Sequence, residues 1–189
     1  MTKLYRMFSE GEGFMDIKRD KYLNDLINRM HNGMIKVVTG IRRCGKSYLL
    51  FNIFKNYLLE QGVPASHIIM IELDQRKNKK YRDPDVILDY IESLIEEDGQ
   101  YYIMLDEVQM LQEFEEVLNS LLHIRNADVY VTGSNSKFLS KDVITEFRGR
   151  GDEIHIYPLT FKEFMEAYDG DMYHGWAEYV VYGVLPLNV

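Results

Sequence analysis

Short apolar runs alternate with amphipathic segments along most of the chain. Runs rich in β-branched and aromatic residues predict five strands, over residues 34–39, 68–73, 101–105, 129–132 and 153–157. Between them, apolar residues recur at helical spacing over residues 46–61, 85–97, 114–124 and 137–147. Alternation of this kind predicts an α/β fold, in which helices cover both faces of a parallel sheet.

Helices are also expected near both ends of the chain. An opening helix is predicted from residue 17 to about residue 30, and two closing helices over 160–168 and 176–182. We therefore expect a flexible lead at 1–15, one core at 16–170, and the start of a helical lid or C-terminal region at 171–189. The sequence stops abruptly after Gly183-Val184-Leu185-Pro186, which fits a fragment of a longer protein.

The composition is that of an ordinary globular protein. Of 189 residues, 46% are hydrophobic and 28% charged, and no apolar run approaches the roughly 18 residues that span a membrane. The N-terminus lacks the apolar segment of a signal peptide, so a cytoplasmic location is expected. The single cysteine excludes an intramolecular disulfide. A net charge of −8 argues against a protein that binds nucleic acid with its whole surface, but leaves room for a local basic patch.

Residues 40–47, G-I-R-R-C-G-K-S, match the phosphate-loop (Walker A) pattern G-x-x-x-x-G-K-[ST] in full. The motif follows a predicted strand and opens a predicted helix, so its amides can converge on phosphates. Gly40 and Gly45 allow close backbone approaches, Lys46 neutralises the β- and γ-phosphates, and Ser47 supplies a hydroxyl to Mg²⁺. The sequence therefore predicts binding of ATP and Mg²⁺.

The other loop residues are expected to contact the nucleotide as well: Ile41, Arg42, Arg43, Cys44 and Tyr48. The two arginines could bind ATP, pair with a neighbouring acid, or remain solvated. Cys44 is interpreted as a small loop residue, although a helix N-terminus can lower the pKa of a thiol.

The hydrophobic run 101–105 ends in Asp106 and Glu107, which is a Walker B arrangement. Ligands bind beyond the carboxyl ends of parallel strands, so Asp106 is expected beside Ser47, where it can hold Mg²⁺. Glu107 would orient and polarise the water that attacks the γ-phosphate. This favours hydrolysis over phosphoryl transfer by a small-molecule kinase; the alternative is that both acids only cap the next helix.

Two further segments are candidates for contact with the γ-phosphate. After the predicted strand 129–132, Ser134 or Asn135 could act as a sensor, or the segment could simply cap a helix. Arg148 and Arg150 lie in a Gly-rich turn, where a guanidinium could stabilise the transition state, often for a neighbouring subunit. A loop salt bridge is the other interpretation.

Four segments together, V-V-T-G-I-R-R-C-G-K-S, I-M-L-D-E-V-Q, V-T-G-S-N-S and R-G-R-x-x-E-I-x-I-Y-P-L-T-F-K-E-F, resemble the archaeal-type ATPases of the AAA superfamily, found in archaea and bacteria. The resemblance implies a three-layer P-loop NTPase with five parallel strands in the order 5-1-4-3-2. It also implies a lid and a region resembling restriction endonucleases, which we expect to be missing after Val189. The opening segment 17–22 is expected to lie near the adenine, or else to have only a packing role. The resemblance assigns Gly40, Gly45, Lys46 and Ser47 to nucleotide, Asp106 to Mg²⁺, Glu107 as base, Ser134 as sensor and Arg150 as finger.

The expected function is therefore Mg²⁺-dependent ATP hydrolysis coupled to an unknown partner or polymer, by a chain that could form homo-oligomers. One alternative is a nucleotide-sensing switch with negligible turnover. Another is an ATPase associated with nucleic acid through the basic stretch 76–82, although such a stretch is more commonly a solvated mobile loop. The five histidines show no metal-ligand spacing, and no membrane contact is expected.

Overall fold

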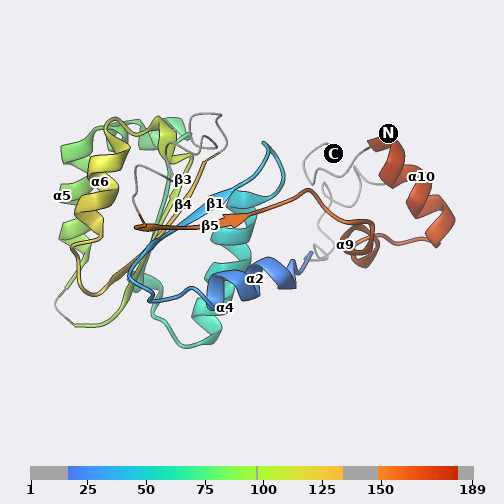
Figure 1. Cartoon of the computed structure of the whole chain (residues 1–189), viewed down its shortest axis with the longest axis horizontal. Helices are drawn as coiled ribbons and strands as arrows, with labels where there is room; N and C mark the ends of the chain where they lie inside the picture. The colour runs from blue at the N-terminus through green and yellow to red at the C-terminus, as the bar shows by residue number, and fades with distance from the viewer. Residues whose placement is uncertain (1–16, 97, 134–148, 183–189) are drawn as a thin grey trace.

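The computed structural model describes residues 17–96, 98–133 and 149–182, whose strands form one parallel sheet (Figure 1). The strands lie in the order β2-β3-β4-β1-β5, and every neighbouring pair is parallel. This is the order 5-1-4-3-2 in reverse direction, so the predicted fold is confirmed. The strands are β1 (Ile35–Thr39), β2 (Ile68–Glu72), β3 (Tyr101–Asp106), β4 (Ala127–Thr132) and β5 (Gly151–His155).

Helices cover both faces of the sheet because successive strand residues point to opposite sides. Ile35 and Val37 of β1 join the core under α5 (Pro84–Leu94) and α6 (Phe114–Leu121), whereas Val38 joins the opposite core. That second core is covered by α2 (Asp20–Ile27) and a continuous helical run. The run consists of α3 (Lys46–Tyr48), the π-helical η1 (Leu49–Phe54) and α4 (Lys55–Glu60).

The other elements that the structure describes are three short 3₁₀ helices and two closing helices. The short 3₁₀ helices are η2 (Ala65–His67), η3 (Arg76–Arg82) and η4 (Val108–Met110). The closing helices α9 (Phe161–Glu166) and α10 (Met172–Tyr182) lie to one side of the sheet (Figure 1). Across the described ranges, none of these helices combines the length and the apolarity needed to cross a bilayer.

Several predicted boundaries differ from those of the structure. The fifth strand begins at Gly151 and ends at His155, because its ladder with β1 pairs Ile35 with Gly151. The helices predicted to reach residues 97 and 124 end at Leu94 and Leu121, and α10 begins at Met172. The stretch 76–82 forms η3 instead of a loop. The predicted lead 1–15 and the predicted helix 137–147 lie outside the described residues.

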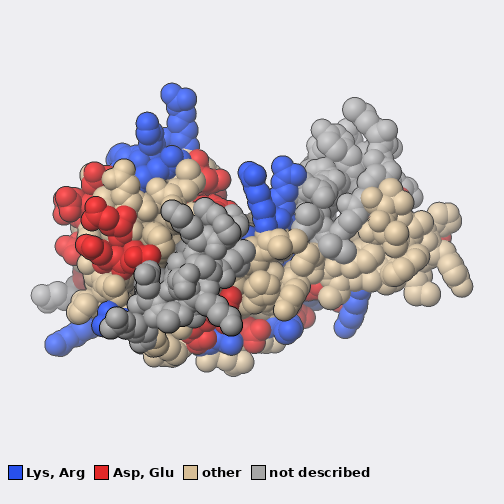
Figure 2. Space-filling model, turned by 45° about the horizontal axis from the view of Figure 1, so that its top comes forward, with Lys and Arg blue, Asp and Glu red and all other residues tan. Residues whose placement is uncertain are grey.

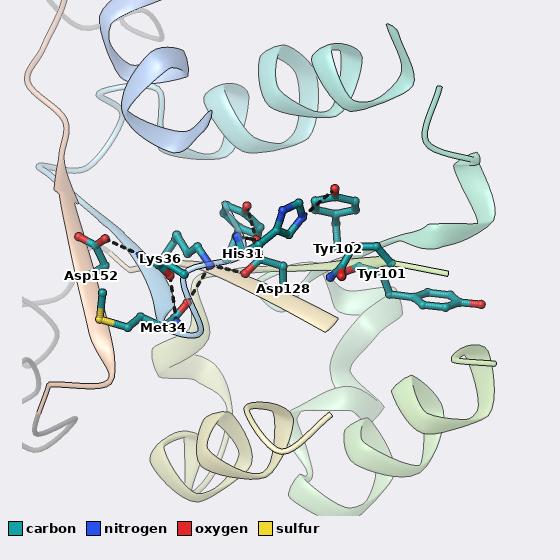
Figure 3. A network of polar contacts seen from close by, with 10 residues as sticks. His31, Met34, Lys36, Tyr101, Tyr102, Asp128 and Asp152 are labelled. Atoms are coloured by element: carbon teal, nitrogen blue, oxygen red, sulfur yellow. Dashed lines mark hydrogen bonds and ion pairs between the residues drawn. The ribbon is translucent and has the colours of Figure 1, made fainter. Parts of the chain in front are cut away.

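A buried polar network joins the amino ends of β1 and β4 (Figure 3). Lys36, fully buried on β1, forms an ion pair with Asp128 of β4 and donates a 2.9 Å hydrogen bond to the Met34 carbonyl. Asp128 also accepts hydrogen bonds from the Tyr130 hydroxyl (2.7 Å) and the His31 amide (3.0 Å). Burial lowers the pKa of Lys36, and its hydrogen bond to Asp128 opposes that shift. The network fixes two central strands at the edge opposite the loop that follows β1.

Candidate nucleotide-binding and hydrolysis site

The phosphate loop is the turn from the end of β1 into α3. Gly40 and Gly45 both have positive φ, at 144° and 96°, which favours glycine. A Cβ on Gly40 would collide with the carbonyl oxygen of Ile156 and would lie 2.9 Å from the Cys44 sulfur. The loop backbone is therefore packed directly against the segment that follows β5.

Lys46 lies inside this loop with 4% of its surface exposed. Its ammonium donates hydrogen bonds to the carbonyl oxygens of Gly40 (3.1 Å) and Ile41 (2.9 Å). These neutral acceptors hold a positive charge at the N-terminus of the helical run that begins with α3. A helix N-terminus with an adjacent cation favours a phosphate group.

Ser47 and Asp106 meet beside the loop, as the sequence predicts. The Ser47 hydroxyl donates a 2.9 Å hydrogen bond to Asp106 Oδ1, and the Thr132 hydroxyl of β4 donates to the same oxygen. Burial raises the pKa of Asp106, while the hydrogen bonds from Thr132 and Ser47 act in the opposite direction. The carboxylate is thus held close to the loop at the carboxyl ends of β3 and β4.

The oxygen donors at this point suit Mg²⁺. This ion usually takes one or two protein carboxylates and completes its shell with phosphate oxygens and water. The hydroxyl of Ser47 and the carboxylate of Asp106 form such a partial donor set. Within the described part of the chain, no group of three or more His, Cys, Asp or Glu residues could hold a metal ion alone. When bound with phosphates, Mg²⁺ would stabilise negative charge on them.

Glu107 follows β3 directly and has a left-handed backbone with φ of 53°. Its amide donates a 3.0 Å hydrogen bond to the Thr132 hydroxyl, which ties its position to β4. Its carboxylate accepts a hydrogen bond from the side-chain amide of Gln109. The other amide atom of Gln109, Oε1, is buried and has no hydrogen-bond donor among the residues that the structure describes. Sequence analysis missed Gln109, although it stands two residues after the predicted base.

Residues 32–165, well over half of the chain, match the protein family described as AAA domain. The chain belongs to this family. An uncharacterized protein of Haemophilus influenzae is 34% identical over 176 residues, which cover 90% of this chain and 44% of that protein. An uncharacterized protein of Methanocaldococcus jannaschii is 29% identical over 154 residues, covering 79% of this chain and 32% of that protein. The chain thus spans less than half the length of these curated relatives.

Solved structures share the fold of this AAA domain at low sequence identity. One is the S. cerevisiae Hsp104:casein complex, with a TM-score of 0.57 and 14% identity, covering 79% of this chain and 28% of that chain. Another is the Aeropyrum pernix ORC1 protein in complex with DNA, with a TM-score of 0.57 and 13% identity, covering 93% of this chain and 53% of that chain. A likeness at this identity shows the fold alone.

A third carboxylate of this AAA domain, Glu72, lies at the same edge of the sheet and was missed by sequence analysis. Glu72 ends β2 and pairs in register with Asp106. Burial raises its pKa; Lys77 opposes this shift, whereas Asp106 and Asp74 add to it. Glu72 also accepts a hydrogen bond from Gln75. Negative charge therefore accumulates where a cation is expected.

The remaining predicted residues are only partly brought to the site. Ile41, Arg42 and Arg43 are exposed loop positions, Tyr48 is half-buried in α3, and Cys44 is fully buried. Burial raises the pKa of the Cys44 thiol, which supports a packing role over a redox one. The candidate sensors and one candidate finger lie outside the described residues: Ser134, Asn135 and Arg148.

Arg150 lies away from the phosphate loop of its own chain. It directly precedes β5, and its carbonyl accepts a 2.8 Å hydrogen bond from Ile35 at the start of β1. Its guanidinium donates to the side chain of Asn119 on α6, at 2.9 Å. The phosphate loop follows the opposite end of β1, and a five-residue strand spans roughly 16 Å. Within one subunit, the structure therefore does not bring Arg150 to the nucleotide-binding residues.

Proposed function

We propose that this AAA domain binds Mg²⁺·ATP and hydrolyses ATP, with Glu107 as the base that activates water. One observation carries the proposal: a buried Lys46 and the linked Ser47 and Asp106 adjoin Glu107 at the carboxyl edge of β1 and β3. In this proposal Lys46 leaves the loop carbonyls for the β- and γ-phosphates. Ser47 and Asp106 hold the ion, and Glu107 accepts the proton of the attacking water.

The test is release of phosphate from ATP by the wild type and by Glu107→Gln, with nucleotide binding measured in parallel. Glutamine has the shape of glutamate but cannot accept the proton, so the variant should bind ATP and lose at least about a hundredfold in turnover. If both proteins bind and neither hydrolyses, the domain is a nucleotide-sensing switch. If neither binds, the proposal fails.

We further propose that Arg150 acts as a finger for the site of a neighbouring subunit. Arg150 is exposed and lies far from the phosphate loop of its own chain, which supports a role at the site of another subunit. Turnover per subunit should then rise with protein concentration. Mixing inactive Glu107→Gln with inactive Arg150→Ala should restore activity, because one mixed interface has both an intact base and an intact finger. Absence of any restoration, with assembly intact, would remove this role.

A second candidate function, contact with a nucleic-acid backbone, is supported by η3. This helix has four exposed basic residues, Arg76, Lys77, Lys79 and Lys80. Figure 2 shows Lys and Arg side chains standing out above the position of η3, on the side where the loop after β1 also lies (Figure 1). The ring of Tyr81 packs against that of Tyr90 in a tilted arrangement, with ring centroids 4.5 Å apart, which favours phosphate contacts over base stacking.

The test is retention of duplex DNA across a salt series. Each lysine that neutralises one phosphate contributes about 0.9 to the slope of log K against log salt. Changing Lys77, Lys79 and Lys80 to Gln should therefore reduce the slope by up to about 2.7. Arg125→Gln, an exposed position just before β4 at the opposite edge of the sheet, is the charge control. No retention at low salt would exclude this function.

A further inference from the structure

Arg19 is a buried arginine that contacts three separate parts of the chain. Only 5% of its surface is exposed, and its backbone is left-handed, with φ of 46°, where α2 begins. Nη1 donates to the carbonyl of Cys44 in the phosphate loop at 3.2 Å, and Nη2 to the carbonyl of Tyr157 after β5 at 2.6 Å. Nε lies 3.2 Å from a carboxylate oxygen of Glu163 in α9. The guanidinium also lies over the ring of Tyr22, at 4.5 Å from its centroid.

Glu163 uses its two carboxylate oxygens for two different tasks. Oε1 pairs with Arg19. Oε2 accepts hydrogen bonds from the amide (2.8 Å) and the hydroxyl (2.9 Å) of Thr160, which caps the N-terminus of α9. The same side chain therefore holds Arg19 and fixes the start of the helix.

The helices α9 and α10 form one unit, which we call the α9–α10 hairpin. Phe161 of α9 meets Trp176 of α10 edge to face, with ring centroids 5.1 Å apart, and Phe164 lies 5.5 Å from Tyr179. The Tyr179 hydroxyl donates a 2.8 Å hydrogen bond to the Leu159 carbonyl just before α9. A displacement at the start of α9 is therefore transmitted to α10.

We propose that Arg19 is a positioning residue that couples the phosphate loop to the α9–α10 hairpin. The pair of Arg19 and Glu163 is largely buried, so separating the two charges would leave an uncompensated buried charge, which is strongly unfavourable. The Cys44 carbonyl and the start of α9 consequently shift together. The inference rests on the proposed binding of nucleotide, since ATP is what would restrain the loop.

Coupling of this kind is reciprocal. If ATP stabilises the arrangement of the loop that Arg19 holds, it must stabilise the docked hairpin by the same factor, and the docked hairpin must strengthen ATP binding equally. Typical couplings correspond to a change of five- to 150-fold, so about fivefold is the minimum expected here.

The experiment is hydrogen exchange of residues 161–166, with and without Mg²⁺·ATP, in the wild type and in Glu163→Gln. Glutamine can keep the capping interaction with Thr160 but removes the charge that faces Arg19. In the wild type, ATP should slow exchange in α9 by at least about fivefold. In Glu163→Gln, this effect should disappear and ATP should bind about fivefold more weakly, while the phosphate loop still becomes protected. Arg19→Lys keeps the charge but loses the planar set of guanidinium donors. This variant should also lose the response of α9 to ATP and bind ATP about fivefold more weakly.

The matched control is Asp152→Asn. It removes another, more exposed ion pair, in which Arg29 Nε lies 2.9 Å from Asp152 on β5, without touching the loop or α9. This control should retain the full response of α9 to ATP. A wild type that binds ATP without any change in α9, or a Glu163→Gln variant that responds like the wild type, overturns the coupling. A wild type that binds no ATP instead overturns the proposed function.

Discussion

The hydroxyl of Ser47 and the carboxylate of Asp106 are joined by a 2.9 Å hydrogen bond, although they lie on different elements, α3 and β3. The two proposed ligands of Mg²⁺ are therefore already together, and ion binding needs only a small rearrangement. Such preorganisation reduces the entropy lost on binding. It also keeps a buried carboxylate in the site, which is unfavourable for the protein by itself.

The first prediction concerns Asp106→Asn. The amide oxygen can still accept from Ser47 and Thr132, whereas the buried charge is gone, so the variant should unfold at the same or a higher temperature without ligand. At a concentration of Mg²⁺·ATP of 100 times Kd, the wild type should gain about 2.7 kcal/mol of stability, and the variant clearly less. Thermal unfolding with Mg²⁺·ATP, and with ATP plus a chelator, measures both effects. An equal gain in the two proteins would show that Asp106 does not hold the ion.

Lys46→Met tests the phosphate loop. Methionine fills the space of the lysine stem but carries no charge for the phosphates, so ATP affinity should fall at least about tenfold, or 1.4 kcal/mol. Titration with a fluorescent ATP analogue measures this loss. Lys55→Met, the same change at the start of α4, should leave the affinity unchanged.

Gln109→Met releases the carboxylate of Glu107 from its side-chain amide donor. The buried Oε1 of Gln109, which has no described donor, disappears as well, and removing such an acceptor should stabilise the fold by about 1 kcal/mol. With this donor gone, the Glu107 carboxylate accepts one hydrogen bond fewer from the protein and can accept one from water in its place, so we expect turnover to rise about threefold or more, with ATP affinity unchanged. Steady-state kinetics gives both values. A fall in turnover would mean that Gln109 aligns the base instead of restraining it.

The network around Lys36 predicts a dependence of stability on pH. The pKa of Lys36 in the folded chain lies below the ordinary lysine value of 10.5, mainly because the side chain is buried. Between those two values the unfolded chain binds more protons, so the contribution of Lys36 to the free energy of unfolding rises with pH. Urea unfolding from neutral pH to about 10.5 should show this rise in the wild type but not in Lys36→Met.

Breaking the same pair from the other side should be more damaging. Asp128→Asn leaves Lys36 buried without its counter-charge, which should cost about 3–5 kcal/mol. The network lies at the edge of the sheet opposite the phosphate loop, so ATP affinity of the folded protein should not change. Reduced affinity at a temperature where the variant is fully folded would contradict this separation.

The fold and the centre of the site could be predicted from the sequence because their signals are local. The strands β1 and β3 are apolar runs in the sequence. The phosphate loop directly follows β1, and the pair Asp106-Glu107 stands at the end of β3. Rules for parallel sheets then bring these segments to one edge. The family resemblance added the order of the strands.

The residues that were missed act across long separations. Arg19 contacts Glu163, and Glu72 meets Asp106 only through the pairing of β2 with β3, so neither has a motif near it. Gln109 is close in sequence to Glu107, but an amide two residues after an acid is too common to indicate a contact. Arg150 directly precedes β5, and because β5 runs parallel to β1, this places it at the amino end of the sheet, opposite the phosphate loop.

Gly40 has an unexpected consequence for the recognition of inactive homologues. Its lack of a side chain is demanded by the carbonyl of Ile156 and the sulfur of Cys44, both parts of the protein itself. A descendant that had lost all nucleotide chemistry would be free to replace Lys46, but would still need glycine at position 40 to close its fold. In evolutionary comparisons, the first glycine of the loop therefore reports ancestry, whereas the lysine reports whether ATP is still used.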